Sequence, residues 1–135
     1  MTVNESASIT INGLTREIIG AAIEVHRCLG LGLLESSYEA CLCRELSLRN
    51  VPFERQVPLP IEFKGLKLDC GYRVDLLVAK SVVVEVKSVE SLKPIHDAQI
   101  LTYLQLGDWH VGLLINFNVP VLGAGIRRHV LHLEE

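Results

Sequence analysis

The segment Val82–Lys87 constrains the fold most, because it reads Val-Val-Val-Glu-Val-Lys. Four valines in six residues predict a strand near the centre of a sheet. Alternate residues of a strand share a face, so Glu85 and Lys87 project together while Val84 and Val86 project to the other side. Charges inside such a strand cost free energy unless they are paired or bound to a metal. The segment therefore indicates either a functional site or an ion pair on a solvated sheet face.

A second carboxylate is expected beside this pair of charges. If residues 79–81 form the connection to the preceding strand, the two strands pair symmetrically about Lys80 and Asp75 falls opposite Glu85. Two carboxylates that face each other on one sheet repel. A hard divalent cation such as Mg²⁺ between them would remove the repulsion. Lys87 would then add a positive charge suited to a phosphate or to an attacking water.

Hydrophobic periodicity predicts the elements around these residues. Helical spacing is expected over 14–29, 35–49 and 94–106. Asn12 or Thr15 is the candidate N-cap of the first helix. Residues 53–63 carry two prolines and are expected to form an edge strand or an irregular extended segment, followed by a turn at 64–65. The remaining strands are expected over 66–78, 82–88, 111–117 and 127–133.

Composition narrows the class of protein. The chain has 135 residues, of which 49% are apolar and 5% aromatic, so we expect one aliphatic core. Residues 1–12 are expected to form a loose extension, and residues 13–135 a single domain. The four cysteines show neither a CxxC pair nor zinc-ligand spacing, and we find no secretory signal. These features favour a cytoplasmic protein with reduced thiols. No apolar run approaches the length of about 20 residues that spans a membrane.

The net charge of −3 argues mildly against a protein that grips a long nucleic acid through its overall charge. It does not exclude nucleic acid, because net charge says little about a local groove.

Several motifs in order resemble a known family. Asp75, followed after a turn by Glu85-Val86-Lys87, resembles the D…(D/E)xK signature of the PD-(D/E)XK nuclease superfamily. Gln99 and Tyr103 on the next expected helix look like the QxxxY element found in some of its branches. Upstream, residues 32–38 read Gly-Leu-Leu-Glu-Ser-Ser-Tyr and match the signature that names the GxxExxY protein family within that superfamily. The resemblance covers nearly the whole chain.

The resemblance implies an α/β, restriction-endonuclease-like fold with a central mixed β-sheet flanked by helices. It also implies a metal-dependent phosphodiesterase centre at the middle of that sheet. Asp75 and Glu85, with Glu35 from the start of the second helix, would bind Mg²⁺ or Mn²⁺, and Lys87 would be the catalytic lysine. The site residues implied in this way are Glu35, Asp75, Glu85, Lys87, Gln99 and Tyr103.

The expected function is that of a Mg²⁺-dependent nuclease, acting on DNA in preference to RNA. An alternative is a non-catalytic binding or regulatory module on the same fold, acting through a protein partner. A third possibility is a nuclease that is complete only as a homodimer, because a domain this small could need two copies to span a duplex.

Overall fold

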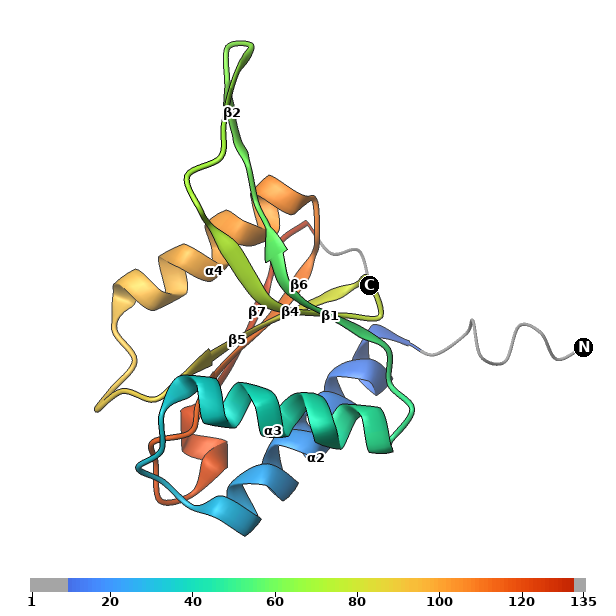
Figure 1. Ribbon diagram of the computed structural model, residues 1–135, viewed down its shortest axis with the longest axis vertical. Helices are drawn as coiled ribbons and strands as arrows, with labels where there is room; N and C mark the ends of the chain where they lie inside the picture. Colours follow the sequence, from blue (N-terminus) through green and yellow to red (C-terminus); the bar gives the residue numbers. More distant parts are fainter. Residues whose placement is uncertain (1–9, 133–135) are drawn as a thin grey trace, which may run out of the picture.

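The computed structural model describes residues 10–132, which form a mixed five-stranded sheet with helices on both faces (Figure 1). The sheet has the order β1-β4-β5-β6-β7, in which only the β5–β6 pair is parallel. This mixed sheet flanked by helices confirms the predicted α/β, restriction-endonuclease-like architecture. The helices and strands are α2 Ile11–Leu29, α3 Glu35–Leu48, β1 Phe53–Pro58, β2 Ile61–Phe63, β3 Leu66–Leu68, β4 Arg73–Val78, β5 Val82–Lys87, α4 Pro94–Gly107, β6 Val111–Asn116, the 3₁₀ helix η1 Leu122–Gly125 and β7 Ile126–Val130.

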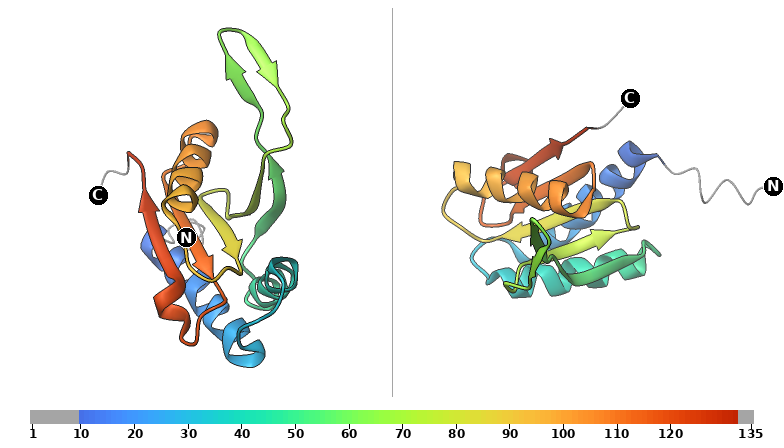
Figure 2. Two further views of the ribbon diagram at one scale, coloured as in Figure 1. Left: turned by 90° about the vertical axis from the view of Figure 1, so that its left-hand side faces the viewer. Right: turned by 90° about the horizontal axis from the view of Figure 1, so that it is seen from above.

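Strand β5 is the middle strand of the sheet, and both of its faces are covered by helices (Figure 2). On one face, Val82, Val84 and Val86 pack in a cluster with the apolar stripes of α2 and α3. On the other face, Val83 packs with Ile100 and other residues of α4. A strand that is buried on both sides explains why its apolar residues run almost without interruption. The charged residues of β5 are therefore exceptions within a buried element.

Helix α2 begins earlier than its periodicity predicts. Thr10 is the N-cap, with extended backbone and a hydroxyl Oγ1 that accepts a hydrogen bond of 2.8 Å from the Gly13 amide. The predicted caps Asn12 and Thr15 are wrong, because both residues already lie inside the helix. Ile11 and Asn12 consequently belong to the fold rather than to a loose extension, and the rest of the predicted extension, residues 1–9, lies outside the described residues.

The predicted long strand over 66–78 is two strands. Residues 69–72 separate β3 from β4, and Gly71 there has a φ of +80°, which favours glycine. In the described part of the chain, strand β3 pairs only with β2, through a two-residue turn at Lys64 and Gly65 in which both φ angles are positive. We call residues 61–68 the projecting hairpin, because it stands away from the main sheet (Figures 1 and 2).

The remaining expectations differ from the structure mainly at element ends. β1 is an edge strand of the main sheet, as its prolines predict, and β7 forms the opposite edge from Ile126 to Val130 rather than over 127–133. No helix within residues 10–132 has the length and hydropathy required to cross a membrane.

Candidate active site

Strands β4 and β5 separate at one end, and the candidate site lies where they do so. The pairing Val78↔Val82, Leu77↔Val83, Leu76↔Val84 is symmetric about Lys80, which confirms the predicted register. The ladder ends after the third pair, at Leu76 and Val84. Asp75 and Glu85 are the next residues in this register, so they occupy the point at which the backbones part.

The two carboxylates replace the missing ladder bonds. The Asp75 amide donates to Glu85 Oε2 at 2.8 Å, and the Val86 amide donates to Asp75 Oδ2 at 2.8 Å. Each carboxylate thus binds the backbone of the opposite strand, and this reciprocal arrangement fixes both side chains in the gap between the strands. We call Asp75 and Glu85 the carboxylate pair.

Burial and proximity disfavour two full charges in this pair. Glu85 is only 6% exposed, and its burial, reinforced by the charge of Asp75, raises its pKa to about 8. Burial also raises the pKa of Asp75 above its ordinary value, against the opposing effect of the Val86 amide. Lys87 lies two residues beyond Glu85 on the same face of β5, and its positive charge lowers the pKa of both carboxyls. The sheet therefore brings the three predicted residues together.

Glu35 and Lys87 are linked through the residue that follows β5. Glu35 opens α3, as predicted, and its Oε2 accepts a hydrogen bond of 3.2 Å from the Ser88 amide. Ser88 also donates its hydroxyl to the Leu33 carbonyl. The loop before α3 is thereby joined to the end of the strand that carries Lys87.

Gln99 and Tyr103 of α4 lie on the other side of the site. Both line a hollow of about 240 Å³ between α4 and the base of the projecting hairpin. Tyr103 packs in one cluster with Val83, on the face of β5 that also carries Glu85. Burial raises the pKa of Tyr103, and the charges of Glu85 and Asp75 raise it further. Gln99 is exposed one helical turn away.

Comparison with known proteins agrees with this arrangement. A family model described as the PD-(D/E)XK nuclease superfamily matches residues 12–129. The chain belongs to the PD-(D/E)XK nuclease superfamily. Searches of the curated proteins and of the solved structures gave no match. Members of this superfamily are nucleases that generally use divalent metals, so a nucleic-acid substrate follows for a protein of this class.

The carboxylate pair has the donor chemistry that a PD-(D/E)XK metal site requires. One oxygen of each carboxylate binds a backbone amide, which leaves Asp75 Oδ1 and Glu85 Oε1 for a hard cation. Asp75 Oδ1 has only a long contact of 3.4 Å from Gln56 Nε2. Among residues 10–132, no three His, Cys, Asp or Glu side chains form a cluster able to hold a metal. Two carboxylates suffice for Mg²⁺, however, because this ion commonly completes its shell with waters and substrate phosphate.

Two polar residues near the pair were not predicted from the sequence. Glu39 is 7% exposed, and its carboxylate accepts hydrogen bonds from Gln56 Nε2, at 3.1 Å to each oxygen, and from Arg55 Nε at 2.9 Å. Its charge raises the pKa of both members of the carboxylate pair. Gln56 sits opposite Asp75 at a φ of +52°, which is unusual for a residue other than glycine. The spacing of Glu35 and Glu39, four residues apart on one helix face, is the sequence signal that could have revealed Glu39.

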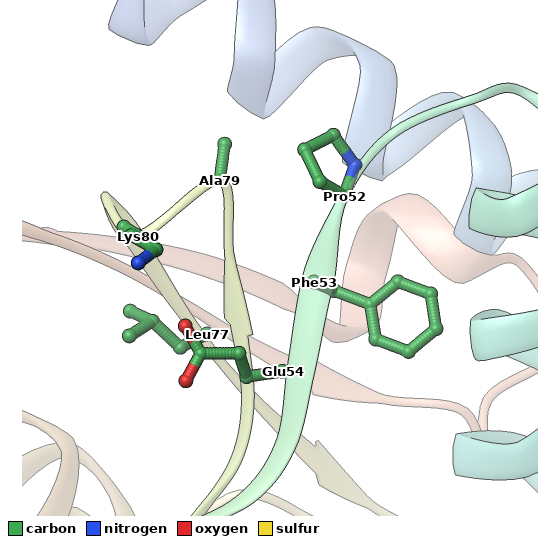
Figure 3. A pocket seen from close by; sticks show the side chains of 6 residues that line it. All are labelled: Pro52, Phe53, Glu54, Leu77, Ala79 and Lys80. Atoms are coloured by element: carbon green, nitrogen blue, oxygen red, sulfur yellow. The ribbon is translucent and has the colours of Figure 1, made fainter.

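A larger hollow of about 420 Å³ lies at the other end of β4, beside the turn at Ala79 and Lys80 (Figure 3). Glu54 and Lys80 extend into this region, whereas the Phe53 ring points to the opposite side of β1. The lining contains one acid and one base and no second carboxylate, so it offers neither the donor set nor the charge arrangement of the carboxylate pair.

Proposed function

We propose that the protein is a divalent-metal-dependent nuclease that hydrolyses phosphodiester bonds in DNA, with Mg²⁺ or Mn²⁺ as its cofactor. The observation that carries the proposal is the convergence of Asp75 and Glu85 where β4 and β5 separate, with Lys87 two residues beyond Glu85 on the same face of β5. Two adjacent buried carboxylates repel, and a cation between them would remove that repulsion. The same geometry that is unfavourable for two free carboxylates is favourable for a metal site.

Each residue has a chemical role in this proposal. Asp75 and Glu85 would hold the cation, which polarises a phosphoryl oxygen and lowers the pKa of a bound water. Lys87, beside the pair, would stabilise the charge that develops on the phosphate. Gln99 and Tyr103 would contact the substrate from α4.

The resemblance implies Glu35 as a third ligand, but no three His, Cys, Asp or Glu side chains within residues 10–132 form a cluster able to hold a metal, so Glu35 would act through its hydrogen bond to the Ser88 amide. That contact fixes the end of β5 one residue beyond Lys87. We further propose that the chain belongs to the GxxExxY branch of the superfamily. The support is that Gly32, Glu35 and Tyr38 all help to shape or anchor the loop before α3. Gly32 has a φ of +99°, and the Tyr38 hydroxyl donates a hydrogen bond to the Gly30 carbonyl.

We also propose that the protein acts in the cytoplasm. The cysteines support this, because Cys28, Cys41, Cys43 and Cys70 are all free thiols in the structure.

The proposal is tested by incubating the protein with single- and double-stranded DNA and RNA in the presence of Mg²⁺, Mn²⁺ or EDTA. We expect DNA cleavage that needs the metal and that falls by at least about 100-fold in Glu85→Ala, because the metal loses one of two carboxylates. Glu54→Ala, at an exposed acid in the other hollow, is the matched control and should cut at the wild-type rate. Cleavage that persists in EDTA or in Glu85→Ala would contradict the proposal.

The competing function is a non-catalytic binding or regulatory module that acts through a protein partner. The observation in its favour is that no third acidic ligand joins the carboxylate pair among the described residues. Absence of cleavage on every substrate, together with a stable protein partner whose binding does not depend on Glu85, would support this alternative.

A further inference from the structure

The projecting hairpin exposes an apolar face that residues 10–132 leave uncovered. The pairs Ile61↔Leu68 and Phe63↔Leu66 place four apolar side chains on one face. Phe63 is 63% exposed and Leu66 is 56% exposed. A two-stranded hairpin gains little stability from such residues unless they pack against something. Exposed apolar surface of this kind marks a site of interaction.

This face continues into the hollow beside the carboxylate pair. Ile61, at the base of the hairpin, lines the hollow of about 240 Å³ together with Tyr72, Gln99 and Tyr103. The Tyr72 and Tyr103 rings are tilted at 57°, with centroids 6.5 Å apart. Tyr103 in turn packs in one cluster with Val83, which lies on the same face of β5 as Glu85. An extended ligand that lay along the hairpin would therefore reach the proposed cleavage site.

A cation lies beside an aromatic residue at each end of this face. Arg73, the first residue of β4, donates from Nη1 to the Tyr72 carbonyl at 2.9 Å, whereas Lys67 pairs with Glu62 on the opposite face of the hairpin. Lys64 Nζ lies 5.3 Å from the centroid of the Phe63 ring. Aromatic rings interleaved with cations are the usual means by which proteins bind single-stranded nucleic acid, since bases stack on the rings while cations contact the phosphates.

We propose that the projecting hairpin and the adjoining hollow bind unpaired nucleotides of the strand that is cut, so that single-stranded DNA or a frayed DNA end is the preferred substrate class. The inference rests on the proposed nuclease function and narrows its substrate. An unpaired base presents open faces that can stack on Phe63 or Tyr72. A base inside a duplex is already stacked on its neighbours, and exposing it costs free energy.

A second copy of the chain suits this face less well. Across an isologous interface the same surface meets itself, so each copy would bring its own Lys64 beside the apolar face without bringing an acid on that face. Phosphate groups supply the opposite charge instead. A simple dimer contact would also not explain why the apolar face of the hairpin continues into the candidate site.

The test measures the affinity of a fluorescently labelled single-stranded DNA oligonucleotide by anisotropy, in EDTA so that no cleavage occurs. We expect Phe63→Ala and Phe63→Leu to weaken binding by roughly 5- to 100-fold, the usual effect of losing a stacked base, whereas Phe63→Tyr retains it. Affinity for the matching duplex should change much less. Leu48→Ala, at a leucine of α3 that is 60% exposed, is the control and should bind as wild type.

The variants separate stacking from simple apolar contact. If Phe63→Leu binds single strands as tightly as wild type, the ring has no stacking role and the inference is wrong. It is also wrong if sedimentation shows a dimer that Phe63→Ala dissociates while affinity for the oligonucleotide stays unchanged.

The hairpin inference and the nuclease proposal can fail separately. If wild type cuts single-stranded DNA and Phe63→Ala cuts it with the same KM, the hairpin inference fails while the nuclease proposal stands. If no substrate is cut but Phe63→Ala and Phe63→Leu lose affinity for single strands, the hairpin binds nucleic acid and the nuclease proposal fails.

Discussion

Lys87→Ala is expected to lower kcat for DNA cleavage by about 100- to 1000-fold while Mn²⁺ still binds. The carboxylate pair supplies the proposed ligands and is unchanged in this variant, so metal binding should survive. The lost group is the positive charge beside the pair, which would act on the phosphate as charge develops in the transition state. Activity should be measured as single-turnover cleavage at saturating metal, so that binding and chemistry are separated.

Two controls accompany this variant. Lys80→Ala removes the same charge from the exposed turn at the other end of the β4–β5 hairpin and should leave kcat unchanged. Lys87→Met keeps the length of the side chain and should be as inactive as Lys87→Ala, which excludes loss of packing as the cause. A Lys87→Met enzyme that cuts within a few-fold of wild type would show that the lysine has no catalytic part.

Tyr38→Ala is expected to reduce the free energy of unfolding by about 3–5 kcal/mol. The Tyr38 ring is fully buried and stacks on Phe117, with centroids 4.6 Å apart and an interplanar angle of 8°. Its hydroxyl donates to the Gly30 carbonyl at 2.6 Å and accepts from the Leu33 amide at 3.2 Å. The substitution would therefore leave a cavity and also release the loop that contacts Ser88.

Urea denaturation measures this loss. Tyr38→Phe keeps the ring and loses only the hydroxyl bonds, so it should cost about 1–3 kcal/mol. Phe63→Ala, at an exposed ring, should change stability by no more than about 0.5 kcal/mol. An equal loss in Tyr38→Phe and Tyr38→Ala would mean that packing on Phe117 contributes nothing, contrary to the role of the Tyr38 ring described above.

The carboxylate pair was predictable because its position follows from local rules. A three-residue connection and continuous valine pairing leave one register, and that register puts Asp75 next to Glu85. The sequence does not show that the backbones part beyond Leu76 and Val84. This separation depends on what the carboxylates bind, and here they bind the amides of Asp75 and Val86.

Glu39 and Gln56 were missed because their role depends on tertiary contacts. Glu39 belongs to α3 and Gln56 to β1, and only the packing of the helix beside the edge strand brings their side chains together. The periodicity of α3 shows Glu39 as one acid on a helix, without indicating that it is buried. The positive φ of Gln56 is likewise invisible in a sequence, since glutamine rarely adopts it.

The projecting hairpin was hidden by an apolar pattern that extends across residues 66–78. Leucines and valines on both sides of Asp69-Cys70-Gly71 suggested one strand, although the Asp and Gly are typical of a break. Similarly, the cap of α2 was placed too late because Asn12 and Thr15 are both good capping residues. In each case the residue types indicate a break or a cap, but the sequence alone does not show at which residue it occurs.

The central claim is that Asp75 and Glu85 together hold one divalent cation, and anomalous scattering from crystals soaked in Mn²⁺ tests it most directly. We expect a manganese peak within coordination distance of both carboxylates in the wild type and no peak there in Glu85→Gln. A wild-type site that stays empty at an Mn²⁺ concentration that supports cleavage, or a peak bound only by other residues, would contradict it.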